Sequence, residues 1–507
     1  MRRRRLNRVR ACALLAAVFV ALAANTAARP GGGESYRGSS SHSSGSSTHY
    51  YSPSSGPSGG GGGNVDSGLV LELVLLCFRY PPLGLVVVAG IVGWAVVNNR
   101  RRSSAPDWSI GGAPARVEAP TRAQSARREL TQLVEADPGF SLVLFEDFVY
   151  ALYAEIQVSR ARGGVGRLAA FLNPAVLQQL YDPALERVEG VVIGAMRYLD
   201  VELGPERTFV TLELEANLTE VRGQTAQRYY VCDRFVVSRA RTARSRPPGR
   251  TRKLDCPNCG APLEGMRGTT CAYCHQEVGG GRLDWLVERI ERVTTENQPP
   301  AVTTDVPESG NALPTLVAPG VDARMAELTA RDPATDPGAL TARVGLVFNE
   351  LQLGWSNLDL ARVRPFVTDN LFQYFGYWID VYVASHARNV TENARILNIE
   401  LVDVMADAVY DAVTLRVFAT GLDYTVSDDG RLLRGSKSRE RPYSEYWTLV
   451  RGHGVRGRPR AEPACPSCGA PLRIAMAGNC EYCHARVVSG EFDWVLSRIE
   501  QDEAYGG

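Results

Sequence analysis

One cysteine pattern, present twice, constrains the fold of this chain more than any other feature. Each copy consists of two Cys-x2-Cys pairs separated by eleven residues. An offset of 209 residues relates every cysteine of the first copy to one of the second, and it also relates segments 283–291 and 492–500. The eight cysteines are Cys256, Cys259, Cys271, Cys274, Cys465, Cys468, Cys480 and Cys483. Two motifs in the same register indicate a duplicated unit that carries a cysteine site near its end.

Four thiolates on two short turns form the usual ligand set of tetrahedral zinc. Pro257 and Gly260 in the first copy, and Pro466 and Gly469 in the second, favour such tight turns. Both copies resemble zinc ribbons. We therefore predict two structural zinc ions per chain, one for each set of four cysteines.

Three other uses of these cysteines compete with zinc. Disulfide bonds are not expected in a reducing compartment such as the cytoplasm. A histidine, His275 or His484, follows the last cysteine of each copy, so both copies also contain the haem-attachment pattern. Haem attachment would leave the first cysteine pair of each copy without a role, and we expect these histidines to lie beside the metal rather than to bind it. An iron centre uses the same four thiolates, so the sequence leaves zinc and iron both open.

The N-terminal part has the composition of an exported, membrane-anchored segment. Residues 1–28 combine an Arg-rich start with a short apolar run, which predicts a signal sequence. Residues 29–68 are rich in Gly and Ser, and because such a segment cannot bury a core we expect it to be disordered. Residues 69–99 form the predicted membrane segment, with its helix at about residues 80–97.

The length and flanking charges of that segment predict a single crossing of the membrane. A helix over residues 80–97 would be about 27 Å long, close to the hydrocarbon thickness of about 30 Å. Arg100, Arg101 and Arg102 follow at once. Because positive residues stay on the cytoplasmic side, we expect the C-terminal bulk to be cytoplasmic and the Gly/Ser segment to lie outside.

After a predicted linker at residues 100–140, the same order of elements occurs twice. Apolar residues at helical spacing are followed by long segments with strand-like alternation. This order predicts an α+β fold with helices on one face of each antiparallel sheet. The predicted strands are 191–203, 208–221, 227–240, 394–405, 410–420 and 440–451. The predicted division is a first α+β domain at 141–245, zinc ribbon 1 plus a helix at 246–293, a linker at 294–322, a second α+β domain at 323–455, and zinc ribbon 2 plus a helix at 456–507.

Several apolar stretches of the second domain resemble the Tim-44-like domain family, named after a subunit of the inner-membrane translocase. The stretches are 355–360, 363–371, 399–404, 410–417 and 444–451. The resemblance covers residues 323–455, and residues 141–245 more loosely. It implies two cone-shaped domains related to cystatin-like and nuclear-transport-factor-two-like folds. Bacterial relatives share the layout of signal, Gly/Ser tract, membrane helix and domain, which implies a location at the bacterial inner membrane. The mitochondrial import role is not implied.

The remaining motifs favour binding over catalysis. The sequence contains no dinucleotide-binding glycine motif, P-loop, metalloprotease motif or nucleophile elbow. The net charge is +1, so no global field favours nucleic acid. Two basic stretches precede the cysteine sets, and we expect them to be solvated, flexible hinges that could meet anionic lipid. They comprise Arg239, Arg241, Arg244, Arg246, Arg250, Arg252 and Lys253 in the first copy, and Arg451, Arg456, Arg458 and Arg460 in the second.

Together these features predict a non-enzymatic, membrane-tethered scaffold or binding protein with a protein client. Two alternatives remain open at this point. One is an enzyme with a reaction in a pocket of the α+β domain, and the other is a nucleic-acid-binding zinc-ribbon protein. A pocket with converging polar groups would favour the first alternative. Basic residues and exposed aromatic rings on one face of a ribbon would favour the second.

Overall fold

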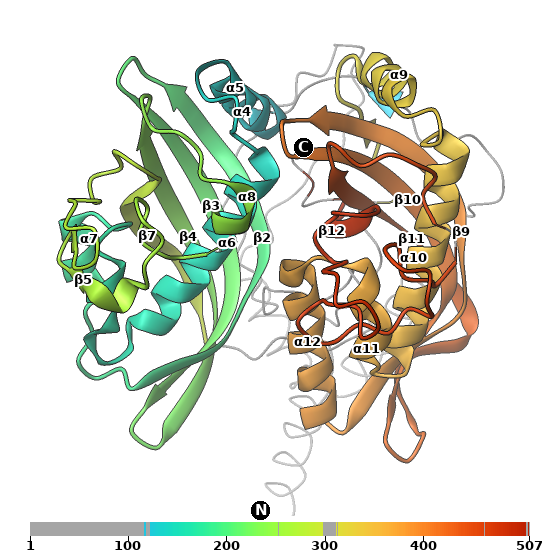
Figure 1. Ribbon diagram of the computed structural model, residues 1–507. Helices are drawn as coiled ribbons and strands as arrows, with labels where there is room; N and C mark the ends of the chain where they lie inside the picture. The colour runs from blue at the N-terminus through green and yellow to red at the C-terminus, as the bar shows by residue number, and fades with distance from the viewer. Residues whose placement is uncertain are drawn as a thin grey trace, which may run out of the picture. The chain divides into compact units, whose positions relative to one another are not determined.

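The computed structural model describes residues 116–117, 122–251, 253–297, 311, 313–460, 462–502 and 505 (Figure 1). The predicted signal sequence, Gly/Ser-rich segment and membrane helix lie outside the described residues. Within the described part of the chain, no helix is both long and apolar enough to cross a bilayer. The described residues form two modules that belong to one compact unit.

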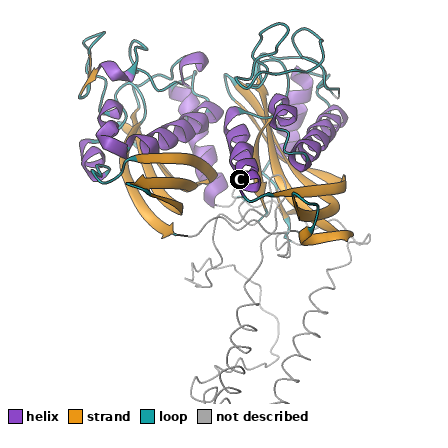
Figure 2. Cartoon of the chain, turned by 90° about the horizontal axis from the view of Figure 1, so that it is seen from below, coloured by secondary structure: helices purple, strands orange, loops and turns teal. Residues whose placement is uncertain are grey.

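The first module, residues 122–297, places helices on one face of a four-stranded antiparallel sheet (Figure 2). Its helices are α4 (Arg122–Thr131), α5 (Leu133–Ala136), α6 (Leu142–Ser159), η1 (Ala161–Leu168), α7 (Pro174–Gln179), α8 (Pro248–Thr251) and η2 (Leu263–Gly265). Its strands are β2 (Arg187–Leu203), β3 (Arg207–Arg222), β4 (Thr225–Ala240), β5 (Met266–Arg267), β6 (Thr270–Cys271) and β7 (Leu286–Glu296). The order in the large sheet is β2-β3-β4-β7, and β5 pairs with β6 in a separate hairpin.

The second module, residues 313–502, repeats this arrangement. Its helices are α9 (Val321–Arg331), α10 (Pro337–Ser356), α11 (Leu360–Val363), η3 (Arg364–Phe366) and α12 (Asp369–Ala384). Its strands are β9 (Ala387–Ala406), β10 (Tyr410–Ser427), β11 (Leu432–Gly452) and β12 (Val495–Gln501), in the order β12-β11-β10-β9. A short parallel pair, β1 (Arg116–Val117) with β8 (Thr315–Leu316), joins the segments that precede the two modules.

The helices and sheets form as the sequence pattern predicts. Ser141 begins α6, and its hydroxyl accepts a hydrogen bond from the backbone N–H of Leu144. Phe148 and Leu152 of α6, like Leu351 and Trp355 of α10, are buried against the sheets of their own modules. All six predicted strands are confirmed, although the strands of the second module are longer than predicted. The α+β prediction is therefore confirmed for both modules.

The predicted helix after each cysteine set is wrong. Segments 283–291 and 492–500 run into β7 and β12, which are the fourth strands of the two sheets. β7 pairs with β4, and β12 pairs with β11, along an otherwise open edge. Backbone pairing with the neighbouring strand decides the conformation here, because local pattern is a weak guide for a short edge strand. Along the chain, each cysteine set therefore lies between the third and fourth strands of its sheet.

The predicted boundary at residue 140 also differs from the structure. Helices α4 and α5 fall in the predicted linker, yet Leu130 and Leu133 are buried in the core of the first module. The ribbon boundaries at 246 and 456 likewise cut a continuous sheet, because the last strand follows the cysteines. The modules are thus larger than the predicted domains.

Helix α6 also packs against the second module. Val143 and Leu144 share a small buried cluster with Tyr410, Val450 and Val495, on the face of the second sheet opposite its own helices. This arrangement leaves apolar side chains of α6 in contact with two sheets. The contact therefore joins the modules through buried apolar surface.

A buried charge cluster lies beside this apolar contact. Glu146 of α6 accepts a hydrogen bond from Arg127 at 2.9 Å and also pairs with Arg498 of β12. The hydroxyl of Tyr198 donates to the same carboxylate at 3.1 Å. Burial alone would raise the pKa of Glu146, but the two guanidinium groups lower it from 4.5 to about 2.

We predict that Glu146→Gln lowers the free energy of unfolding by about 3–5 kcal/mol, because it leaves two buried guanidinium groups without their carboxylate. The native pKa lies below the unfolded value, so the wild type keeps this stability above pH 4.5 and loses it as the pH falls from 4.5 to about 2. Chemical denaturation across this pH range measures both effects. Glu189→Gln is the control, since the Glu189–Arg187 pair is exposed and should contribute less than about 1 kcal/mol. Equal losses for both variants would contradict the role of Glu146.

Candidate metal centres and a cavity between the modules

Both cysteine pairs of the first set lie in turns of one type. In each turn the residue after the second cysteine donates its N–H to the carbonyl of the first cysteine. Gly260 donates to Cys256, and His275 donates to Cys271, each at 2.9 Å. Gly260 has φ +78° and His275 has φ 56°, so both turns close through a left-handed residue. The turn directs the two thiols of a pair to the same side.

The second set repeats this geometry. Gly469 donates to Cys465 and His484 donates to Cys480, again at 2.9 Å, with φ 75° and 60°. His275 and His484 are therefore turn residues, and neither is among the four side chains of its cluster. In the first set, β5 and β6 pair across Gly268 and form a hairpin in the segment that joins the two cysteine pairs.

The structure brings together all four cysteines of each predicted set. The sulfur atoms of each set lie within 4.8 Å of one another. Cys256 and Cys274 are 3.9 Å apart at Sγ, Cys259 and Cys271 are 3.8 Å apart, and Cys465 and Cys483 are 3.9 Å apart. These separations are far too long for disulfide bonds. Each cluster could hold a metal ion with protein ligands alone.

Within each cluster the thiols differ in acidity, because burial and hydrogen bonds with neighbouring cysteines raise the pKa of Cys259 to about 12 and that of Cys468 to about 11, while another thiol of the same cluster is shifted downward. In each set the first cysteine of each pair is buried and the second is more exposed. A hydrogen bond from the side chain of Asn258 lowers the pKa of Cys274 to about 6. A backbone hydrogen bond from Ala485 lowers the pKa of Cys483 to about 6. A thiolate is the form that binds a metal ion.

A buried tryptophan directly precedes the strand that follows each cluster. Trp285 precedes β7, and an arginine of β4, Arg239, stacks 5.1 Å from its ring centre. Arg239 forms an ion pair with Asp137 at 3.0 Å, and all three side chains are buried. The residue before the tryptophan, Asp284, accepts the N–H of Trp285 and pairs with Arg246 at 2.7 Å.

The second module contains the same arrangement. Arg451 of β11 stacks 4.7 Å from the ring of Trp494 and pairs with Asp332 at 3.0 Å. Asp493 accepts the N–H of Trp494 at 2.7 Å. We call the Asp–Arg–Trp group of each module its strand clamp: Asp137, Arg239 and Trp285 in the first, Asp332, Arg451 and Trp494 in the second. In the sequence, the only sign of the strand clamp is the Asp-Trp dipeptide that recurs at the offset of 209 residues.

The strand clamps change the interpretation of the basic stretches. Arg239, Arg246 and Arg451 were predicted to lie in solvated hinges, but all three are buried and ion-paired. Burial lowers the pKa of Arg239 and Arg451, while Asp137 and Asp332 oppose that effect. Other arginines of the stretches are accessible: Arg241 is half-buried, and Arg244, Arg456, Arg458 and Arg460 are exposed.

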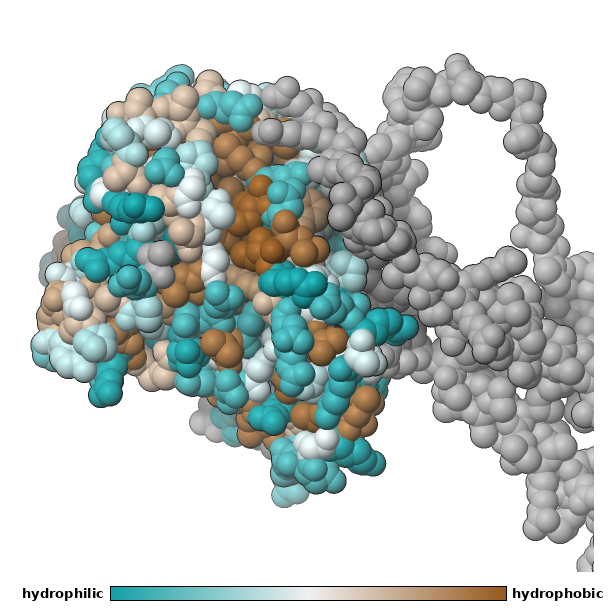
Figure 3. All heavy atoms as spheres, turned by 90° about the vertical axis from the view of Figure 1, so that its right-hand side faces the viewer, coloured by the Kyte–Doolittle hydropathy of each residue, from teal (hydrophilic) through white to brown (hydrophobic). Residues whose placement is uncertain are grey.

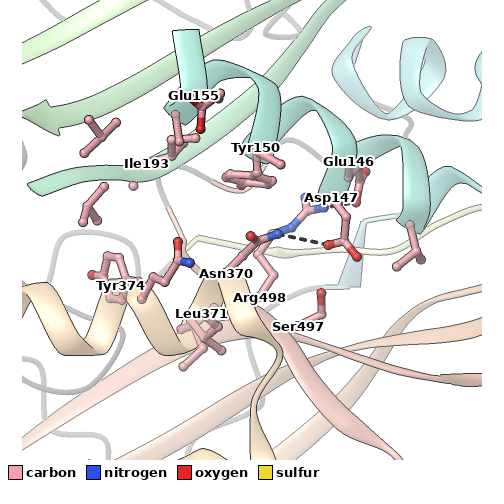
Figure 4. A pocket seen from close by; sticks show the side chains of 18 of the residues that line it. Glu146, Asp147, Tyr150, Glu155, Ile193, Asn370, Leu371, Tyr374, Ser497 and Arg498 are labelled. Carbon is pink, nitrogen blue, oxygen red and sulfur yellow. Dashed lines mark hydrogen bonds and ion pairs between the residues drawn. The ribbon is translucent and has the colours of Figure 1, made fainter. Parts of the chain in front are cut away.

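A cavity of about 290 Å³ lies between the modules (Figure 4). Side chains of α6 and β2 from the first module and of α12 and β12 from the second line it. Tyr150 and Asp147 of α6 face Leu371 and Asn370 of α12, and the Asn370 amide donates to Asp147 at 3.0 Å. Burial raises the pKa of Tyr150 to about 12, so this hydroxyl keeps its proton. A second cavity of about 190 Å³ shares Asp147, Ala151 and Asn370 with the first and extends toward the second cysteine cluster.

We predict that Arg239→Gln destabilises the first module by about 3–5 kcal/mol, because it leaves Asp137 buried without its cation and removes the stacking on Trp285. Arg244→Gln is the matched control at an exposed position and should change stability by less than about 0.5 kcal/mol. Thermal and chemical unfolding of the two variants measure the difference. If Arg239→Gln were as stable as the control, the clamp would have no structural role.

The comparisons with known proteins identify one region. Residues 321–459 match the family model described as Tim44-like domain. This region begins at α9 and ends before Cys465, so it leaves out the second cluster and β12. A search of curated proteins found no match. The second module is thus similar to the Tim44-like domain over its helices and first three strands, and the first module repeats the same α+β order with its own four-cysteine cluster.

Proposed function

We propose that this chain is a non-enzymatic binding protein, tethered to the bacterial inner membrane, whose two modules are stabilised by structural zinc. The observation that carries the proposal is the cavity between the modules, which both copies of the duplicated unit build together. The sequence supports the tether through the apolar segment at residues 80–97 and the arginines that follow it. The modules would then face the cytoplasm, where thiols remain reduced.

The sulfur geometry supports zinc in both clusters. A zinc–sulfur bond of about 2.3 Å in a tetrahedron places the sulfur atoms about 3.8 Å apart. The Sγ separations of 3.8 and 3.9 Å agree with this value. A centre with four thiolates leaves no coordination position for a substrate, which suits a structural role. An iron centre would fit the same ligands, so metal analysis is needed to identify the ion.

We predict that the purified cytoplasmic part binds two zinc ions per chain, and that Cys259→Ser and Cys468→Ser each remove one. Elemental analysis and chelator-coupled absorbance on reduced protein measure the number of ions. Cys232→Ser is the control, because Cys232 lies in β4 outside both clusters and its loss should leave two ions. Iron in place of zinc, or no metal at all, would contradict the zinc assignment.

The cavity supports an apolar ligand from a protein client. Val143, Ala154, Val191, Leu371 and Ile499 supply apolar lining. Glu146 binds two arginines, Glu155 pairs with Arg167, and Asp147 accepts a hydrogen bond from the Asn370 amide. Paired groups can orient a ligand but are poor proton donors and acceptors, which favours binding over catalysis. Apolar side chains also gather on another face of the molecule, the one that lies on the right-hand side of Figure 1 (Figure 3).

Anionic lipid remains a proposed additional partner. Four exposed arginines, Arg244, Arg456, Arg458 and Arg460, could meet lipid headgroups if the modules lie close to the membrane. Replacing Arg239 or Arg246 would not test this role, because both are buried in ion pairs. A variant restricted to the four exposed positions tests lipid binding without disturbing the fold.

We predict that Ala151→Trp blocks the binding site, because Ala151 lines both cavities between the modules. A photo-crosslinking amino acid at Val158, an exposed residue at the cavity rim, should give a defined protein adduct in intact membranes. That adduct should disappear in Ala151→Trp and persist in Ala342→Trp, an exposed control on α10. If only lipid adducts formed, the ligand of the cavity would be an acyl chain instead of a protein client. An adduct that persists in Ala151→Trp would reject the cavity as the site.

A further inference from the structure

We infer that the C-terminal metal centre controls the docking of the two modules and thereby the cavity between them, whereas the N-terminal metal centre stabilises its own module alone. This inference rests on the proposed occupation of the clusters by metal. It deepens the proposed function, because it assigns a regulatory role to one of two otherwise similar sites.

The first step concerns the chain path. The second cluster, Cys465 to Cys483, lies entirely in the connection between β11 and β12. β12 has only seven residues and lies at the edge of the sheet, where it pairs with β11 and forms one further bridge, from Leu496 to Val367. A strand this short depends on how its connection is anchored. A metal ion that joins residues 465 and 483 shortens the free part of this connection and lowers the entropy cost of placing β12.

The second step concerns what β12 contributes to the junction. Arg498 pairs with Glu146, and Val495 belongs to the apolar cluster that includes Val143. Ser497 and Ile499 line the cavity. The same short strand therefore supplies an ion pair, an apolar contact and part of the cavity wall. If β12 leaves the sheet edge, all three are lost together.

The third step concerns how the cluster holds the strand in place. Asp369, the first residue of α12, pairs with Arg364 and with Arg486, which follows the last cysteine of the cluster. The hydroxyl of Tyr410 donates to the carbonyl of Ser489 at 3.0 Å. The N–H of Thr368 donates to the carbonyl of Leu496 at 3.0 Å. These contacts tie β12 and the segment between the last cysteine and β12 to the rest of the module, so a folded cluster positions β12.

The fourth step is the difference between the copies. Arg289 of β7 occupies the position of Arg498 at the common offset, but it is exposed. β7 pairs with β4 and packs on α7, both within the first module, and its bridge from Val287 to Leu172 matches the bridge from Leu496 to Val367 in the second. Metal loss from the first cluster should therefore loosen the first module's sheet edge, while Arg498 and Glu146 keep their contact.

The test uses two fluorescent labels, introduced as unnatural amino acids at the exposed positions Gln224 and Arg431, one in each module. Single-molecule energy transfer in the metal-loaded protein should show one narrow docked population. Cys468→Ser should shift most molecules to a broad population of different transfer efficiency, whereas the matched variant Cys259→Ser should retain the docked population. Metal analysis of each variant is run in parallel.

Arg498→Gln separates docking from folding of the cluster. It should retain both metal ions and still lose the docked population, because it removes the ion pair without touching a cysteine. It also decides the inference if Cys468→Ser fails to fold. A docked population that survives in Arg498→Gln would overturn the inference.

The remaining outcomes separate this inference from the zinc proposal. If Cys468→Ser loses one metal ion and stays docked, the inference is wrong and the zinc proposal stands. If both cysteine variants undock equally, the proposed difference between the two centres is wrong. If the wild type holds no metal after reconstitution with zinc, the zinc proposal fails and the inference fails with it.

Discussion

The placement of the fourth strand in each sheet is the constraint on which the rest of the structure depends. That strand comes after the four-cysteine segment, so the sheet is complete only when the segment has folded back. The strand clamp fixes its start by stacking a buried guanidinium on a buried indole, as Arg451 does on Trp494. A buried arginine is stable only with a carboxylate beside it, which Asp332 supplies. The clamp thus joins the two ends of the connection between the third and fourth strands, and the cysteine cluster closes the middle of it.

The two modules share the cysteine cluster and the strand clamp, and they differ in their outer surfaces. Both modules have a four-cysteine cluster, a strand clamp and a helix that packs on the sheet. Glu146 is the asymmetric element, because it lies in the first module and binds Arg498 of the second. Its binding to two arginines makes the junction specific for these two modules. A duplicated fold therefore forms a shared cavity that neither copy would have alone.

Much of the fold could be predicted from the sequence, and the failures have physical causes. The six long strands follow from local alternation of apolar and polar residues, and the structure shows each of them. The segments after the cysteines were misread as helices because an edge strand has little alternation of its own. The role of Arg239 was missed because its partner Asp137 lies far away in the sequence and only the tertiary fold brings them together. The cavity could not be predicted for the same reason, because residues that are distant in the sequence line it together.

Hydrogen exchange of the β7 and β12 amides, with and without metal, tests the central claim most directly. Each of them pairs with only one other strand of its sheet, so their protection reports how firmly the connection holds them. The account predicts strong protection in the metal-loaded protein and loss of protection in both strands on chelation, while β3 and β10 remain protected. If β7 and β12 stayed protected after complete removal of the metal, the cysteine clusters would not be what holds the fourth strands.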